Sequence, residues 1–166
     1  LLNRGFHSSK CCIALNNFIC IKTALLMADM ITDIKFSIII PSYNRSQYIV
    51  KTVQSVLNQS YGNFEIIIVD DGSTDNTESL VNTLSDGRIS YYKTVNKERG
   101  AARNFGISSA TGTYLTFLDS DDLLRENHLH VACSFIKEHQ FPPVFHTGYD
   151  IVDEDGNIIR KWITLP

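Results

Sequence analysis

Residues 64–73 read Phe-Glu-Ile-Ile-Ile-Val-Asp-Asp-Gly-Ser, and this stretch decides the fold class. Its first six residues form a nearly continuous apolar run, which is typical of a strand buried on both faces of a parallel sheet. The polar segment Asp70–Ser73 then ends the strand in a turn. Upstream, the similar run Phe36–Ile40 is stopped by Pro41, so we expect a second buried strand there.

The chain on either side of this stretch alternates between helix-like and strand-like segments. Apolar residues at helical spacing predict helices in Ser46–Ser60, after Ser73-Thr74, in Gly100–Ala110 and in Arg125–Gln140. Asn44 or Ser46 is available to cap the first of these helices, and Ser73 or Thr74 the second. Further strands are expected at Ile89–Tyr92, Thr113–Leu118 and Val144–Asp150, with a turn at Asp155-Gly156 leading into Asn157–Trp162. This alternation predicts an α/β fold with a mostly parallel, doubly wound, Rossmann-like sheet.

Length and composition exclude several classes of protein. The 166 residues are enough for one domain, and 43% hydrophobic with 20% charged residues is ordinary globular composition. A net charge of −3 argues against a nucleic-acid partner. The four cysteines form no C-x-x-C pair, which favours a reducing compartment. The longest apolar run, Phe18–Ala28, is broken by Lys22 and is shorter than the roughly 20 residues of a membrane span. We therefore expect a cytoplasmic protein without a transmembrane segment, and association with the inner face of the membrane stays open.

The N-terminal segment differs in character from the rest. Residues 1–34 contain no acidic residue before Asp29 and show no clear period. The segment is interpreted in three ways: a signal or transit peptide, an irregular extension, or translated sequence upstream of a true start at Met27 or Met30. The third interpretation is favoured. The segment is left out of the fold prediction, and residues 35–166 are taken as the folded domain.

Acidic residues follow the expected strands at one edge of the sheet. Ligands of open α/β sheets bind outside the carboxyl ends of the strands, where residues 41–45, 70–73 and 119–122 should meet. Carboxylates gathered there would raise one another's pKa unless a cation lay between them. Asp119 and Asp121 are therefore candidate ligands of Mg²⁺ or Mn²⁺, which prefer oxygen. Tyr43 is a candidate for stacking on a flat ring, and Arg103 for holding a phosphate.

Four motifs together resemble the family 2 glycosyltransferases, which have the GT-A fold. The motifs are Ile38–Arg45, Val69–Asp75, Gly100–Gly106 and Phe117–Asp122, in this order. The resemblance covers about Phe36 to Trp162 and rests on the whole set, since no single motif is specific. It implies an inverting enzyme that uses a nucleotide-diphosphate sugar, usually a UDP-sugar, with a divalent metal, to build a polysaccharide or another glycan.

The resemblance also assigns roles to residues. Pro41 and Tyr43 lie against the nucleotide base, and Asp71 bonds it. In the Asp-x-Asp motif, Asp119 lies near the ribose and Asp121 binds the metal. Arg103 occupies the place of a basic residue that contacts the nucleotide.

The catalytic base has no evident candidate. In the family it lies well beyond the Asp-x-Asp motif, and this chain has 45 residues after Asp121. The carboxylates beyond Glu138 are those of Asp150, Asp153, Glu154 and Asp155, which are expected at a strand end and in a turn. We therefore expect the chain to be the donor-binding half of a truncated enzyme, whose acceptor is a glycan or a lipid-linked glycan and whose base lies beyond the chain end.

Two alternatives remain open from the sequence. The chain could be a catalytically inactive fragment that only binds a nucleotide-sugar. A receiver-type signalling domain also carries paired aspartates after a strand, as in Ile66–Asp71. In such a domain, however, the pair should follow the first strand, whereas here another strand precedes it.

Overall fold

The computed structural model describes residues 18–21, 33–95, 98–153 and 157–162. Its main sheet has six strands in the order β4-β3-β2-β5-β1-β6. β2 (Phe36–Ser42) pairs in parallel with β3 (Phe64–Asp70) on one side and with β5 (Tyr114–Phe117) on the other, and β4 (Ile89–Lys93) extends the parallel part beyond β3. The strands predicted at residues 36–40, 64–69, 89–92 and 113–118 are therefore confirmed, and these four form a parallel core.

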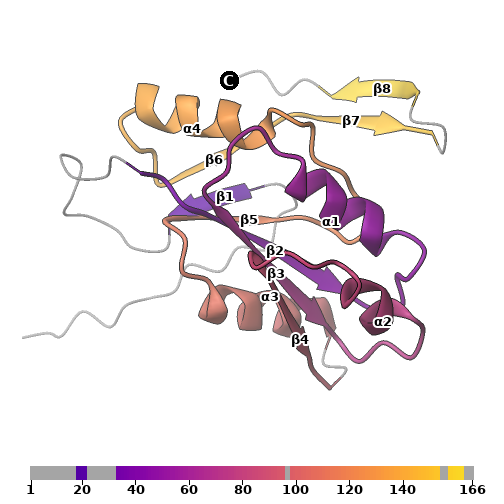
Figure 1. Cartoon of the computed structure of the whole chain (residues 1–166). Coiled ribbons are helices and arrows are strands. Elements are labelled where there is room, and N and C mark those ends of the chain that lie inside the picture. Colours follow the sequence, from indigo (N-terminus) through magenta and orange to yellow (C-terminus); the bar gives the residue numbers. More distant parts are fainter. Residues whose placement is uncertain (1–17, 22–32, 96–97, 154–156, 163–166) are drawn as a thin grey trace, which may run out of the picture.

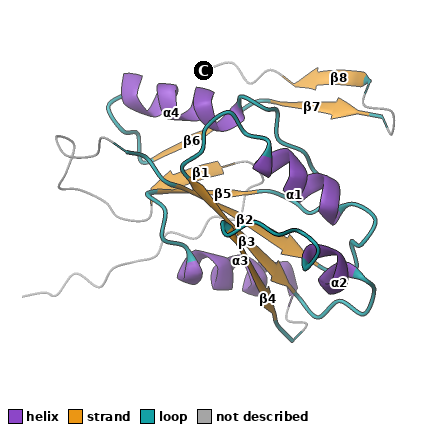
Figure 2. Cartoon of the chain, viewed as in Figure 1, coloured by secondary structure: helices purple, strands orange, loops and turns teal. Residues whose placement is uncertain are grey.

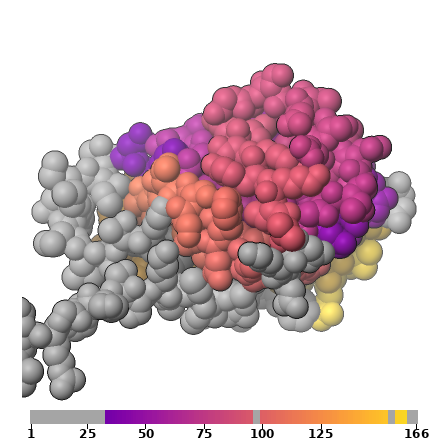
Figure 3. Space-filling view, turned by 90° about the horizontal axis from the view of Figure 1, so that it is seen from below, coloured from indigo at the N-terminus to yellow at the C-terminus, as the bar shows by residue number. Residues whose placement is uncertain are grey.

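Helices cover both faces of this sheet (Figures 1 and 2). α1 (Ile49–Leu57), α2 (Thr77–Val81) and α4 (His128–Glu138) lie on one face, and α3 (Glu98–Ser109) lies on the other. Each face has its own apolar core: Ile38, Ile40, Ile66 and Ile68 point toward α1 and α4, while Ile39 and Ile67 point toward α3. Figure 3 views the molecule from the α3 side. The mostly parallel, doubly wound α/β fold is confirmed.

The N-terminal segment contributes a strand that the sequence did not predict. β1 (Phe18–Ile21) lies antiparallel between β5 and β6 (Val144–His146), with Ile19 opposite both Thr116 and Phe145. A domain boundary at residue 35 therefore leaves these four residues outside the sheet to which they belong. The reason is physical: a four-residue apolar run carries no periodic signal, and its partners lie about a hundred residues away in the sequence. The rest of residues 1–32 lies outside the described residues.

Pro41 does not end its strand, contrary to the prediction. β2 continues through Pro41, which lies opposite Val69, to Ser42. The Leu118 N–H donates to the Ile39 carbonyl, and β5 ends there. Because backbone groups alternate sides along a strand, the nitrogen of Pro41 faces beyond the end of β5, so its missing N–H costs no ladder bond.

The predicted helix caps are also wrong. α1 starts after Tyr48 and α2 after Asn76, and neither N-cap makes a side-chain hydrogen bond. Asn44 instead links two loops, since its Oδ1 accepts from the Thr74 N–H. Asp75 serves both loops in the same way, accepting from the N–H groups of Ser46 and Thr77. The polar residues after β2 and β3 therefore tie these loops to each other.

The single strand predicted at Val144–Asp150 is wrong, because residues 144–146 form β6 of the main sheet and the chain from Tyr149 onward forms a hairpin. The C-terminal hairpin itself is confirmed as a separate two-stranded antiparallel sheet. It pairs β7 (Tyr149–Val152) with β8 (Ile158–Trp162). The predicted turn at Asp155-Gly156 lies outside the described residues. Within the described part of the chain, no helix has the length and apolar character needed to span a membrane.

Glu65 joins three chain segments at the amino ends of the strands, opposite the loops that follow β2 and β3. Its carboxylate accepts hydrogen bonds from Ser37 Oγ (2.5 Å), Lys35 Nζ (2.9 Å) and the Thr111 N–H (2.6 Å). Partial burial opposes ionisation, but these bonds outweigh it and lower the pKa of Glu65 from 4.5 to about 2. The ionised carboxylate therefore holds the start of β2 and the turn before β5 against β3.

Glu65→Gln is expected to lower the free energy of unfolding by about 2 kcal/mol at pH 7, because bonds to a charged acceptor are replaced by weaker ones. Since the folded pKa lies below the unfolded one, the carboxylate's contribution is complete above pH 4.5 and is lost as the pH falls toward 2. Urea unfolding of both proteins at several pH values measures this. Glu126→Gln, at an exposed carboxylate, serves as the control. A difference between wild type and Glu65→Gln that stays constant down to pH 2.5 would contradict the assignment.

Candidate functional site

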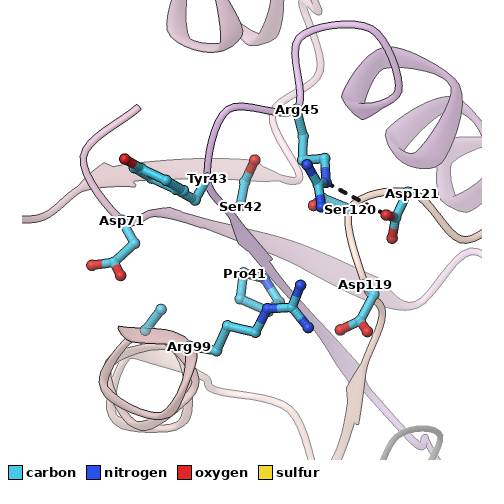
Figure 4. A pocket seen from close by; sticks show the side chains of 10 residues that line it. Pro41, Ser42, Tyr43, Arg45, Asp71, Arg99, Asp119, Ser120 and Asp121 are labelled. Atoms are coloured by element: carbon cyan, nitrogen blue, oxygen red, sulfur yellow. Dashed lines mark ion pairs between the residues drawn. The ribbon is translucent and has the colours of Figure 1, made fainter. Parts of the chain in front are cut away.

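A cavity of about 260 Å³ lies at the carboxyl ends of β2, β3 and β5 (Figure 4). Its walls come from four segments: the end of β2, the turn after β3, the first turns of α3, and the loop after β5. The lining residues are Pro41, Ser42, Tyr43, Arg45, Asp71, Arg99, Ala102, Asp119, Ser120 and Asp121. Five of the six residues predicted for the site therefore line one cavity. The sixth, Arg103, contacts it through Asp119.

The end of β2 supplies an apolar wall. Pro41 is buried, and Tyr43 is 46% exposed, so its ring offers a free face. Ser42 between them is buried, and its Oγ has no hydrogen-bond partner among the described residues. Buried hydroxyls are usually paired, so this one can take a polar group of a ligand without giving up a bond to the protein.

The two aspartates after β3 have different surroundings. Asp70 is fully buried, and its carboxylate accepts from the Ser73 N–H (2.7 Å) and from the hydroxyl of Tyr91. Burial and this bond raise the pKa of Tyr91. Gly72, in the turn, has φ of 83°, a left-handed conformation that favours glycine. Asp70 therefore shapes the turn, while Asp71 lines the cavity.

Asp71 is placed by its neighbours on both sides. Its N–H donates to the Ser42 carbonyl (2.8 Å), and its Oδ1 accepts from Thr94 Oγ1 (3.3 Å). The side chain is nearly buried, and in Figure 4 it lies on the same side of the cavity as Tyr43. A carboxylate beside an aromatic face suits a planar ring that has an N–H donor at its edge.

The loop after β5 carries paired charges. Arg103 Nη2 lies 2.8 Å from Asp119 Oδ1, and both side chains are mostly buried. Arg45 Nε lies 3.4 Å from Asp121 Oδ2, in a pair that is more exposed (Figure 4). Partial burial raises the pKa of the next residue, Asp122, and the charges of Asp119 and Asp121 add to that shift. The loop thus concentrates negative charge, which two arginines offset.

Helix α1 and Gln59, which lies just beyond its end, hold the loop after β5 in place. Thr52 Oγ1 donates to the Ser120 carbonyl (2.9 Å), and the Leu124 N–H donates to Ser55 Oγ (3.1 Å). Gln59 bonds the Arg125 carbonyl through Nε2 and the Leu129 N–H through Oε1. Because these contacts join positions 66 to 70 residues apart, a single sequence gives no sign of them.

A divalent metal fits this site only together with a ligand. Among the described residues, no group of three or more His, Cys, Asp or Glu side chains could hold a metal ion. Asp119 and Asp121 do line the same cavity. Mg²⁺ is typically held by one or two carboxylates plus substrate phosphates, so the donor set suits a metal that arrives with a phosphate.

Two arginines of the lining have no role that the sequence assigns. Arg45 belongs to the first motif without a function of its own, and Arg99 is one of several basic residues between the acidic clusters. Both are long side chains on loops or helix ends, and the sequence does not tell which way such side chains point. The sequence feature that could have identified them as site residues is their position, since Arg45 lies just beyond a strand end and Arg99 lies at a helix start.

The family comparison matches residues 37–164 to the model described as Glycosyl transferase family 2. An uncharacterized glycosyltransferase of Rickettsia bellii is 41% identical over 134 residues, which is 80% of this chain and 19% of that protein. Glycosyltransferase GlyG of Streptococcus pneumoniae is 39% identical over 124 residues, covering 73% of this chain and 41% of the relative. The Campylobacter jejuni GalNAc(5)-diNAcBac-PP-undecaprenol beta-1,3-glucosyltransferase is 34% identical over 132 residues, covering 77% and 42%. The chain thus spans between about a fifth and under half of these relatives.

Solved structures show the same fold. TarS 1–349 of S. aureus in complex with UDP has a TM-score of 0.61 and 34% identity, covering 63% of this chain and 32% of that one. The complex of the same protein with UDP-GlcNAc matches equally well. Mannosyltransferase PcManGT of Pyrobaculum calidifontis, in complex with GDP-Man and Mn²⁺, has a TM-score of 0.57 and 27% identity, covering 61% and 32%.

Proposed function

This chain belongs to family 2 of the glycosyltransferases, and we propose that its cavity binds the nucleotide-diphosphate sugar, specifically a UDP-sugar, of an inverting, metal-assisted sugar transfer. The observation that carries the proposal is the lining of one cavity by an apolar wall, the Asp71 carboxylate on the side of Tyr43, and two loop carboxylates. Neighbours of the same fold bind UDP, UDP-GlcNAc and GDP-Man, which supports a donor of this class. Family membership excludes the receiver-type alternative.

The proposed roles follow the walls of the cavity. Pro41 and Tyr43 pack against the base, and the Asp71 carboxylate accepts a hydrogen bond from its ring N–H. Asp119 accepts from a ribose hydroxyl. Arg103, which was expected to contact the nucleotide, donates to Asp119 in this structure, so we assign it to holding that carboxylate in position.

Asp121 is the proposed ligand of a Mn²⁺ or Mg²⁺ ion that binds together with the donor. Such an ion supplies Lewis-acid stabilisation of the charge that develops on the departing diphosphate. The chain's own contribution is positional: the bond from Thr52 to the Ser120 carbonyl fixes the backbone between Asp119 and Asp121. Arg45 neutralises Asp121 in this structure.

No residue of this chain is proposed as the general base. Asp150 is paired with Arg125, and Asp153 accepts from the Asn157 side chain. Neither residue lines the cavity. Glu154 and Asp155 lie outside the described residues. We therefore propose that the base and the acceptor site, for a glycan or a lipid-linked glycan, belong to residues other than those lining this cavity. The C. jejuni relative, whose name specifies a lipid-linked glycan, supports that acceptor class.

Titration calorimetry with UDP in the presence and absence of Mn²⁺ tests the donor proposal. UDP is expected to bind with Mn²⁺ and to bind more weakly once the metal is chelated. Circular dichroism on the same sample verifies that the chain is folded. Folded protein that gives no binding heat with UDP and Mn²⁺ would contradict the proposal.

A transfer assay with a UDP-sugar separates the enzyme from its alternative. An inactive donor-binding fragment binds UDP but releases no sugar to an acceptor. What favours this alternative is that the three carboxylates of the described cavity lining, Asp71, Asp119 and Asp121, all have proposed roles toward the donor or the metal, which leaves none of them as the base. Efficient transfer by this chain alone would exclude the alternative and would place the base within the chain.

A further inference from the structure

Three arginines surround the cavity, and two of them are already paired. Arg45 lies against Asp121, and Arg103 lies against Asp119. Arg99 also lines the cavity and is exposed, and its side chain has no ion pair or hydrogen bond with any described residue. Among the described residues of the lining, it is therefore the cation that remains available to a ligand.

The place of Arg99 in the fold is unusual for a cation. It is the second residue of the twelve-residue helix α3. The positive end of a helix dipole disfavours a positive side chain in the first turn. In Figure 4 the Arg99 side chain leaves α3 and points toward the side of the cavity where Pro41 and Asp119 lie. Arg99 is unfavourable for the stability of α3 and faces a cavity, so its presence at this position is better explained by the binding of a ligand.

Charge balance in the cavity identifies the kind of ligand group. Three lining residues are carboxylates, Asp71, Asp119 and Asp121, and the two loop carboxylates have arginine partners. A diphosphate brings further negative charge into this lining, so beside the proposed metal ion it favours a protein cation that is not already paired with a carboxylate. A guanidinium also binds phosphate oxygens through two parallel N–H groups, and the positive end of the α3 dipole favours an anion at the same place.

We propose that Arg99 binds the diphosphate of the donor. The inference rests on the proposed function, because it presupposes a nucleotide in this cavity. It goes beyond that function by assigning the donor's charged group to a residue for which the four motifs give no role.

The test compares UDP with uridine, which has the same base and ribose but no phosphate. Both ligands are titrated in the presence of Mn²⁺ into wild type, Arg99→Gln and Arg99→Lys. Lys137→Gln, which removes an equal charge from an exposed position of α4, is the matched control. Thermal unfolding of each variant confirms that it is folded.

Arg99→Gln should weaken UDP binding about tenfold or more and change uridine binding less than about twofold, since a charged hydrogen bond to phosphate is lost. Arg99→Lys should recover part of the UDP affinity, and Lys137→Gln should resemble wild type. Unchanged UDP affinity in Arg99→Gln would overturn the assignment while leaving the proposed function intact. Equal losses for UDP and uridine would overturn it too, because Arg99 would then act on the base or ribose. If wild type binds no UDP, both the proposed function and this inference fail.

Discussion

Asp121→Ala is expected to abolish the Mn²⁺ dependence of UDP binding. Without the Asp121 carboxylate, Asp119 is the remaining carboxylate of the loop after β5 in the cavity lining. Asp119 is already paired with Arg103. Loss of a residue that only supports a metal ligand typically costs about 10–100-fold in metal affinity, so loss of the ligand itself should cost at least about 100-fold. UDP affinity measured with Mn²⁺ should then fall to the value that wild type shows without metal.

The measurement is calorimetry with UDP, with and without Mn²⁺, together with electron paramagnetic resonance of free Mn²⁺ to count bound metal directly. Glu126→Ala is the control, because it removes an exposed carboxylate from the same segment and leaves the backbone bond between Ser60 and residue 126 in place. The free energy of unfolding of Asp121→Ala should change by less than about 1 kcal/mol, since the pair with Arg45 is partly exposed to solvent and its N–O distance is 3.4 Å. UDP binding by Asp121→Ala that still responds to Mn²⁺ would refute Asp121 as the metal ligand.

The sequence predicts those parts of the site that depend on strand ends. β2, β3 and β5 are apolar runs followed by polar residues, and the geometry of parallel sheets brings such ends to one edge. Pro41, Tyr43, Asp71, Asp119 and Asp121 are therefore expected around one site from the sequence alone, and all five line the cavity. Their chemical roles stay predictions, because shared location does not identify what each side chain binds.

The errors share a physical origin in long-range contacts. Pro41 was expected to end β2, but the cost of its missing N–H depends on where β5 ends. Asn44 was expected to cap a helix, but its side chain bonds Thr74 instead. In both cases a partner at least 30 residues away decides between two local options that the sequence leaves nearly equal. The role expected for Arg103 at the nucleotide stays a prediction, and in this structure its guanidinium donates to Asp119.

Gly112→Ala is expected to destabilise the fold more than Glu65→Gln does. Gly112 lies in the turn between α3 and β5, where its N–H donates to Ser37 Oγ (2.8 Å). A Cβ at this position would lie 2.6 Å from Ser37 Oγ, 2.7 Å from the Ser37 nitrogen and 2.8 Å from the Lys35 carbonyl oxygen. Two of these three atoms belong to the backbone at the start of the central strand β2, so they cannot move without disturbing the sheet.

Overpacking of this kind usually costs about 1–3 kcal/mol, and contacts with backbone atoms place Gly112→Ala at about 3 kcal/mol or more. Domains of this size are stable by only about 5–15 kcal/mol, so the urea midpoint should fall strongly. Gly87→Ala is the matched control, because its added Cβ would meet no atom within 4 Å, and its midpoint should stay near that of wild type. Equal midpoints for the two variants would mean that the turn before β5 can move away from β2. In that case the hydrogen bonds of Glu65 to this turn would not fix the position of β5. The loss of unfolding free energy expected for Glu65→Gln should then also be absent.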